Sequence, residues 1–329
     1  MMSKIWYSAH IYPLTEQFAK QINKIIFQYI WGGRYEPIKR NIVFRTKSEG
    51  GLGIINCFLK AKTLLVNTSL KCYTTSDYNN SLMKYYCYVR LNNIIPINYS
   101  IHDASPITTP YYEAAITTVR SILHLRGFPF VPKDKIYRSM FTKEESLAEL
   151  HYPTFNWQKV RSNYLNIFIL SYDKEVIYKY LHICLATNKK LYTMNLINTG
   201  NCNKCTSNRE ETQLHMFYEC DYVKPFLLWV LRCLLHLCNF KPSSNIRFTF
   251  FDNSYRNTYQ RDICNLFIYM YIITIWRTRK ENLRIGDLKY IFIRRLTDYR
   301  NFIKHIPNQK HEKLADKLST LDIEVLDNL

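Results

Sequence analysis

Apolar residues near the start of the chain repeat at intervals of three and four positions, the spacing of one face of a helix. The positions that follow this spacing are Leu14, Phe18, Ile22, Ile25, Ile26, Tyr29 and Ile30. They predict an amphipathic helix that ends near Trp31. The pair Gly32-Gly33 stops it, because glycine adopts positive φ at low cost.

The next segments alternate between short apolar runs and glycines. Residues 42–44 (Ile-Val-Phe) read as a short strand, and residues 50–54 form the block Gly-Gly-Leu-Gly-Ile. Residues 57–73 are apolar over a longer stretch and predict a helix.

The second half of the chain contains several helix-like apolar segments on either side of a polar, cysteine-bearing loop. They cover residues 160–171, 176–184, 225–240, 262–280 and 288–306. The longest apolar run, Ile263 to Trp276, is shorter than a membrane span requires and predicts a buried core helix. The pattern as a whole predicts a mostly α fold.

A chain of 329 residues is long enough for about two domains. Residues 92–112 are rich in Asn, Pro, Ser and Thr, which is typical of a linker. We therefore expect a helical segment over residues 1–91, a connector over 92–156 and a helical domain with a basic tail over 157–329.

The composition is strongly basic, with 45 Lys and Arg against 26 Asp and Glu and a net charge of +19. Such a charge favours a polyanionic partner such as nucleic acid. The residues encoded by A/T-rich codons (Ile, Asn, Lys, Tyr and Phe) are also abundant, so part of the excess reflects genomic composition. The N-terminus does not read as a signal peptide, so we expect a nuclear or cytoplasmic protein with no membrane partner.

One constellation carries metal chemistry. Cys202 and Cys205 are separated by two residues, His215 follows after nine more, and Cys220 after a further four. Three thiolates and an imidazole suit Zn(II) in a closed tetrahedral, structural site. His215 and Cys220 point about 140° apart on a regular helix, so the helix must end or distort near Glu219.

Other interpretations of these cysteines are weaker. A thioredoxin-like site has no use for His215, and Cys233 and Cys238 lie in an apolar helix where a core position is expected. Glu210 and Glu211 lie close in sequence, but a catalytic zinc needs an open coordination position, and all four ligands are accounted for. Lone cysteines elsewhere read as buried apolar residues: Cys57, Cys184 and Cys264.

The run from Glu211 to Cys220 (ETQLHMFYEC) resembles the zinc-binding region of reverse transcriptases from non-long-terminal-repeat (non-LTR) retrotransposons. That family carries Cys-x-x-Cys and then Glu-(Ser/Thr)-x-x-His-(Leu/Ile/Met)-Phe-x-x-Cys. Trp229 falls where the family often has a tryptophan. Residues 185–191 (LATNKKL) are similar to the preceding Leu-Pro-Thr-x-x-(Arg/Lys)-Leu segment, with Ala186 in place of the proline.

The resemblance extends to residues 5–56, which are similar to the region just past the polymerase palm, and to residues 275–282 (IWRTRKEN). It implies that residues 1–91 are thumb-like. The chain has no Asp-Asp pair to hold two catalytic metals, and no proline is followed by Asp as in the nuclease of some relatives.

The resemblance therefore implies the C-terminal piece of a retrotransposon polyprotein, without a polymerase or nuclease site of its own. The parent would be an RNA-directed DNA polymerase. The piece would help to handle RNA and target DNA in target-primed reverse transcription, beside the rest of the polyprotein. Two alternatives stay open: a free-standing, element-derived, zinc-dependent DNA-binding protein, and a non-functional remnant.

Basic residues around the cysteine loop and in the tail are the candidates for phosphate contacts. They are Lys189, Lys190, Lys204, Arg209, Arg277, Arg279, Lys280, Arg294 and Arg295. Candidate stacking platforms for unpaired bases are Tyr192, Phe217, Tyr218 and Tyr222. The ordinary alternatives are a solvated charged face and, for Phe217, packing around the loop.

Overall fold

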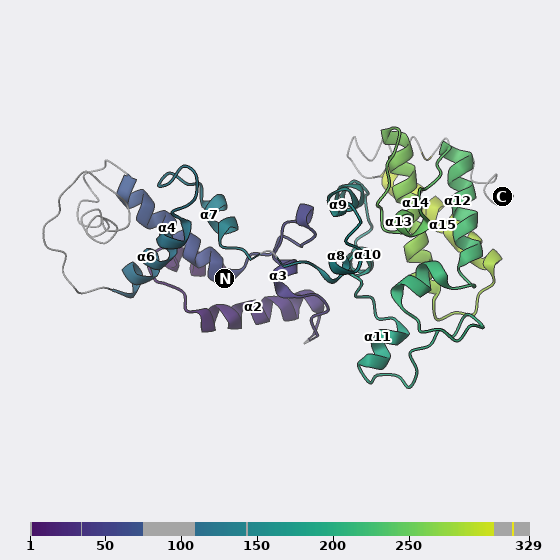
Figure 1. Ribbon diagram of the computed structural model, residues 1–329, viewed down its shortest axis with the longest axis horizontal. Coiled ribbons are helices and arrows are strands. Elements are labelled where there is room, and N and C mark those ends of the chain that lie inside the picture. Colours follow the sequence, from purple (N-terminus) through teal and green to yellow (C-terminus); the bar gives the residue numbers. More distant parts are fainter. Residues whose placement is uncertain (1, 34, 75–108, 143, 306–317, 319–329) are drawn as a thin grey trace, which may run out of the picture. The chain divides into compact units, whose positions relative to one another are not determined.

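The computed structural model describes residues 2–33, 35–74, 109–142, 144–305 and 318 (Figure 1). Over these residues the chain is mostly helical and forms no strand, which confirms the predicted fold class. Two compact units are present: Met1–Phe44 with Leu52–Glu144, and Arg45–Gly51 with Glu145–Leu329. The predicted boundary after residue 91 lies outside the described residues, and the one after residue 156 falls inside the second unit.

The first unit begins with α1 (Met2–Ser8) and the predicted amphipathic helix, α2 (Glu16–Trp31). Thr15 caps α2 by accepting a hydrogen bond from the backbone N–H of Phe18 at 3.3 Å. Gly32 ends it with a φ of 64°, in the left-handed region that glycine tolerates. The predicted end of this helix at Trp31, stopped by Gly32, is therefore confirmed.

Residues 42–44 are not the strand that the sequence analysis predicted. They lie in and just after the short helix α3 (Arg40–Val43), and all three are buried. One helical turn brings the Phe44 ring 5.4 Å from the Phe27 ring of α2. The described residues offer no strand for this run to pair with, so the apolar side chains are buried by helix packing instead.

The rest of the first unit packs around α4 (Cys57–Thr74), which confirms the helix predicted over residues 57–73. It contacts α2, α6 (Pro110–Ile122) and α7 (Lys133–Ser139). The core that α4 shares with α6, α7 and the segment between them consists of Val66, Leu70, Val119, Ile122, Val131 and Ile136.

The second unit contains the five helices predicted for the second half of the chain and three short ones that were not predicted. The predicted ones are α9 (Trp157–Leu165), α10 (Lys174–Leu181), α12 (Lys224–Cys238), α14 (Thr258–Thr278) and α15 (Ile285–Lys304), and the others are α8 (Leu147–His151), α11 (Asn188–Thr193) and α13 (Asn245–Thr249). Only α9 is clearly shorter than predicted. After α9 ends at Leu165, the Phe168 carbonyl accepts a hydrogen bond from the Tyr299 hydroxyl of α15 at 2.8 Å. This carbonyl is therefore bound by α15 and not by a continuation of α9.

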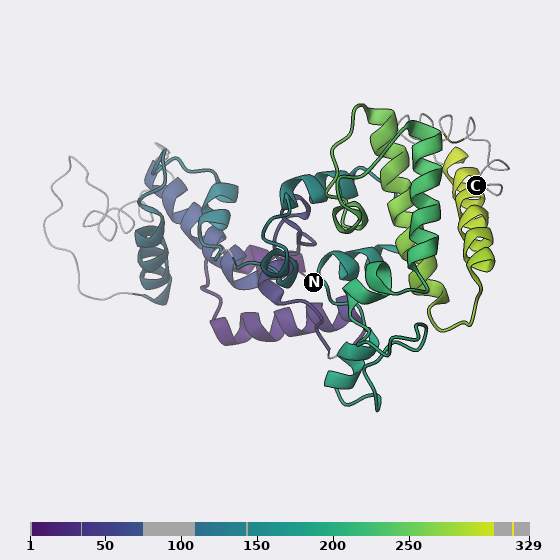
Figure 2. The same cartoon turned by 45° about the vertical axis from the view of Figure 1, so that its right-hand side comes forward.

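Helix α14 is the centre of this unit, and α12 and α15 lie along it (Figure 2). Every residue from Ile263 to Ile275 is buried, as expected for a helix that is apolar on all sides. Phe226 and Trp229 of α12 meet Phe292 of α15 at ring distances of 6.0 and 5.5 Å. None of the described helices, α14 included, has the length and apolar character needed to cross a bilayer.

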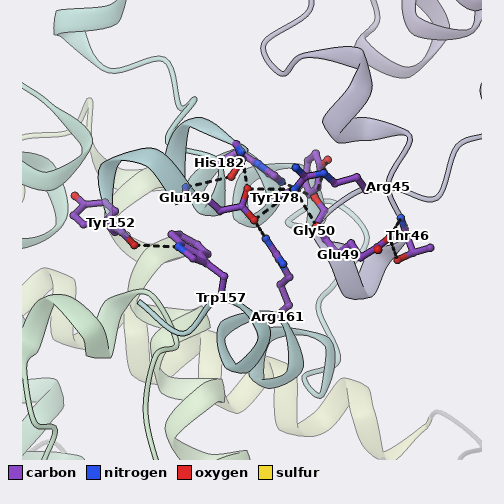
Figure 3. A network of polar contacts seen from close by, with 11 residues as sticks. Arg45, Thr46, Glu49, Gly50, Glu149, Tyr152, Trp157, Arg161, Tyr178 and His182 are labelled. Carbon is purple, nitrogen blue, oxygen red and sulfur yellow. Dashed lines mark hydrogen bonds and ion pairs between the residues drawn. The ribbon is translucent and has the colours of Figure 1, made fainter. Parts of the chain in front are cut away.

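The segment Arg45–Gly51, which includes the short 3-10 helix η1 (Lys47–Glu49), belongs to this second unit (Figure 3). The Glu149 carboxylate pairs with Arg161, and also with Arg45 at 3.2 Å. The Gly50 carbonyl accepts hydrogen bonds from His182 at 2.8 Å and from Tyr178 at 3.4 Å. Residues Arg45–Gly51 therefore form a loop, here called the docking loop, which includes the Gly-Gly pair noted in the sequence. Residues of α8, α9 and α10 hold it in place, together with His182, the residue that follows α10.

Candidate metal centre

The structure brings together the four side chains that the sequence singled out as metal ligands. The ligand atoms of Cys202, Cys205, His215 and Cys220 all lie within 4.8 Å of one another. Cys205 is partly exposed and the other three are buried. This group can hold a metal ion.

A tight hairpin presents the first two cysteines. The Cys202 N–H donates to the Arg209 carbonyl at 2.8 Å, and the Glu211 N–H donates to the Gly200 carbonyl at 2.8 Å. Within the turn, the Lys204 N–H donates to Cys202 Sγ at 3.4 Å. Two residues between the cysteines are just enough for both sulfurs to face the same point.

His215 and Cys220 come from a distorted helical turn, as the sequence analysis predicted. Residues His215–Glu219 form one π-helical turn (η3), closed by a hydrogen bond from the Cys220 N–H to the His215 carbonyl at 2.9 Å. This i→i+5 bond places residues five apart one above the other, which a regular helix does not do. The extended backbone of Cys220 ends the turn before α12 begins at Lys224.

The four ligand atoms include two close pairs. Cys205 Sγ lies 3.4 Å from His215 Nε2, and Cys202 Sγ lies 3.8 Å from Cys220 Sγ. The hydrogen bond between the two thiols lowers the pKa of Cys202, which favours the thiolate that binds metals, and raises the pKa of Cys220. The nitrogen of His215 that faces the cysteines is therefore Nε2, and Nδ1 is buried without a partner among the described residues.

The group is anchored to the core of the second unit. The Tyr271 hydroxyl of α14 donates to the Phe217 carbonyl at 2.6 Å, which fixes the middle of the π turn. The Asn188 N–H at the start of α11 donates to Glu211 Oε1 at 2.9 Å, which fixes the hairpin. A Cβ on Gly200 would lie 3.2 Å from Lys189 Cα, so a larger residue there would push α11 away.

The other cysteines whose side chains the structure describes lie apart from this group. Cys233 is buried in the core, and Cys238 Sγ lies 3.9 Å from Cys264 Sγ. Cys57, Cys184 and Cys264 are buried thiols, as predicted. A cavity of about 30 Å³ borders Cys202 and Cys220, room for one or two waters and far below the size of typical ligand pockets.

Many of the predicted phosphate-binding cations are engaged within the chain. Lys189 pairs with Glu210 at 2.6 Å, and Lys204 donates to Asn282 Oδ1 at 3.2 Å and to the Glu281 carbonyl. The others that donate to groups of the chain are Lys190 to the Cys184 carbonyl, Arg277 to Tyr172 and Asp173, and Arg279 to the Ala186 carbonyl.

Four of the predicted cations are unengaged: the side chains of Arg209, Lys280, Arg294 and Arg295 form no hydrogen bond or ion pair with another described residue. Arg209, Lys280 and Arg294 are exposed, and Arg295 is partly buried. These residues are therefore the most available for a polyanion.

Among the predicted stacking residues, too, some are buried or hydrogen-bonded within the chain and others are exposed. Phe217 is 1% exposed and packs against Tyr180, which bears out the packing alternative for it. The Tyr222 hydroxyl donates to the Leu283 carbonyl at 2.7 Å, and only Tyr192 is more than half exposed. The sequence analysis did not single out Tyr172, which is 62% exposed with its ring beside Arg277, because no local pattern marks a contact between residues so far apart.

The sequence matches no protein-family model and no curated protein. The resemblance to non-LTR retrotransposon reverse transcriptases therefore stays a prediction from the residues quoted above.

Proposed function

We propose that the Cys/His group binds Zn(II). Bond lengths of about 2.3 Å to sulfur and about 2.0 Å to nitrogen in a tetrahedron imply S···S and S···N separations of about 3.8 and 3.5 Å. The separations of 3.8 Å for Cys202–Cys220 and 3.4 Å for Cys205–His215 agree with these values. The ligand atoms thus need little movement to take up the ion.

The proposed zinc is structural. Three thiolates and one imidazole complete a tetrahedron and leave no position for a reacting water. The hairpin over residues 201–210 has few apolar side chains of its own, so the ion replaces a hydrophobic core there. Binding would join the hairpin to the π turn and contribute roughly 10–16 kcal/mol of apparent free energy.

We further propose that the chain is a nucleic-acid-binding C-terminal segment of a non-LTR retrotransposon reverse transcriptase. The Cys/His spacing with its Glu-Thr-x-x-His-Met-Phe-x-x-Cys run, and the Gly-Gly-Leu-Gly block, support the kinship. The net charge of +19 and the four unengaged cations support a polyanionic partner. Its role would be to hold RNA or target DNA during target-primed reverse transcription.

The observation that carries this proposal is the convergence of the four predicted ligands within 4.8 Å. It gives the family-like sequence run the geometry that a zinc knuckle needs. A free-standing DNA-binding protein or a remnant would share the zinc site, but no described feature favours either one.

The test is a salt titration of binding by fluorescence anisotropy, with single-stranded RNA and with duplex DNA, on zinc-loaded and chelated protein. If six phosphates are contacted, log K should fall against log salt with a slope of about −4 to −5. Chelation should weaken binding. Failure of the zinc-loaded protein to bind either nucleic acid at low salt would contradict the proposal and favour the remnant.

A further inference from the structure

An exposed tyrosine is held rigidly at the start of α10. Tyr172 is 62% exposed, yet its backbone carbonyl accepts a hydrogen bond from Arg277 Nη2 at 2.9 Å. The next residue, Asp173, is buried, and its carboxylate binds Arg277 at 3.2 Å and the Tyr269 hydroxyl at 2.7 Å. The turn is thus fixed to α14 while the aromatic ring faces solvent.

Arginines from α14 and α15 interact electrostatically with this tyrosine. The Arg277 guanidinium carbon lies 5.9 Å from the ring centroid. Arg295 lies one helical turn before Tyr299 on α15, and the Tyr299 ring lies 6.1 Å from the ring of Tyr269, the residue that binds Asp173. Burial raises the pKa of the Tyr172 hydroxyl, and Arg295 and Arg277 lower it. Arg277 and Asp173 largely neutralise each other. The Arg295 side chain, in contrast, has no hydrogen bond or ion pair among the described residues.

Such an arrangement suits an unpaired nucleobase. Every base has a π face that stacks on an aromatic ring, and base–aromatic stacking is largely independent of sequence. A nearby guanidinium binds the adjoining phosphate with charge-assisted hydrogen bonds. Because the backbone of Tyr172 is already fixed, little conformational entropy is lost when the ring is covered.

We propose that Tyr172, Arg277 and Arg295 form a stacking site for one unpaired nucleotide of single-stranded RNA or DNA. The base lies on the Tyr172 ring and its phosphate meets Arg295. This inference rests on the proposed nucleic-acid-binding function and adds to it the strand state of the ligand and the residues that read it.

The test uses the full zinc-loaded chain and labelled oligouridine and oligothymidine of about 15 nucleotides. Tyr172→Ala should weaken binding by about 5- to 100-fold, the range measured for loss of one stacked base. Tyr172→Phe should stay within about twofold, because the ring remains. Tyr290→Ala removes a tyrosine on α15 of equal exposure, 62%, and should leave the affinity unchanged.

Two further measurements separate stacking from charge. Duplex DNA should bind Tyr172→Ala as it binds the unaltered protein, since paired bases offer no free face. Arg295→Gln should reduce the salt slope by about one on single strands. Comparing the uridine and thymidine strands then shows whether RNA or DNA is preferred.

The outcomes distinguish the inference from the function on which it rests. If the unaltered protein binds single strands but Tyr172→Ala does so equally well, or weakens binding no more than Tyr290→Ala, the stacking site is refuted and nucleic-acid binding stands. A loss in Tyr172→Phe equal to that in Tyr172→Ala also refutes stacking. If the unaltered protein binds no nucleic acid, both proposals fail.

Discussion

The imidazole of His182 donates a hydrogen bond from Nε2 to the carbonyl oxygen of Gly50, 132 positions earlier in the chain, at 2.8 Å (Figure 3). A carbonyl only accepts, so the neutral ring carries its proton on Nε2. Burial lowers the pKa of His182 to about 4, and Nδ1 is buried without a partner among the described residues. A protonated ring has no acceptor there for its second proton.

The burial of this ring predicts that acid weakens the fold at a pH above the range in which an ordinary carboxylate titrates. The unfolded imidazole has a pKa near 6.5 and the folded one about 4, so the stabilisation is complete above about pH 6.5 and is lost as the pH falls toward 4. Between about pH 7 and about pH 5 the free energy of unfolding should fall by roughly 2 kcal/mol. Urea denaturation at both values measures it, and His182→Gln should remove most of the difference. An equal pH dependence in the variant would contradict the assignment.

Gly51 should not tolerate a side chain. A Cβ there would lie 2.0 Å from the Arg45 carbonyl oxygen, a backbone atom that cannot move without opening the docking loop. Gly51→Ala should lower the free energy of unfolding by about 2–4 kcal/mol. Gly286→Ala is the control, because nothing lies within 4 Å of its Cβ and its φ is not positive. It should change stability by less than about 1 kcal/mol, on the favourable side; equal losses in the two variants would refute the packing argument.

Glu149 should contribute more to stability than a surface carboxylate does. It is 15% exposed at the side chain and pairs with both Arg45 and Arg161, so Glu149→Gln leaves two cations without their partner. We expect a loss of about 2 kcal/mol. Glu16→Gln breaks an ion pair with Lys20 that is exposed to solvent and should cost far less.

The Glu149 carboxylate makes the free energy of unfolding depend on pH in a second range, below that of His182. Burial raises the pKa of Glu149, but the Ser146 N–H and the two arginines outweigh it and leave the pKa below the ordinary value of 4.5. Its contribution is therefore present above about pH 4.5 and is lost as the pH falls through the lower folded pKa. Glu149→Gln should flatten the stability curve below that pH. Because the Glu149 charge raises the pKa of His182, the same variant should extend the His182 range to lower pH and not abolish it.

The unengaged cations should govern nucleic-acid binding more than the paired ones. Arg294→Gln and Lys280→Gln should each reduce the salt slope by about one. Lys189→Gln should change the slope by less than half as much, because Glu210 already compensates its charge at 2.6 Å. Anisotropy titrations of the three variants measure the slopes. A larger effect for Lys189 than for Arg294 would contradict this division.

Local patterns predicted much of the fold. Periodicity predicted α2, α4, α12, α14 and α15, since a long apolar stripe has few alternatives to helix packing. The spacing of five between His215 and Cys220 predicted a helical distortion, because four converging ligands exclude a regular helix there. The short run at residues 42–44 was misread, because three apolar residues carry no period of their own.

What the sequence did not predict depends on contacts between distant residues. Nothing near Gly50 marks His182 or Tyr178 as its partners, so the docking loop was seen only as a glycine block. Likewise, charge alone does not separate Lys204, which is tied to Asn282, from the unengaged Arg209. The four metal ligands were predictable because their chemistry, unlike packing, requires particular residue types at particular spacings.

X-ray absorption at the zinc edge, on protein with its metal content measured, tests the central claim most directly. The account predicts one zinc per chain with three sulfurs at about 2.3 Å and one nitrogen at about 2.0 Å. Cys205→Ser should lose the metal or one sulfur from this shell, whereas Cys238→Ser should keep all four ligands. A shell of oxygen and nitrogen alone, or a chain that binds no zinc, would contradict it.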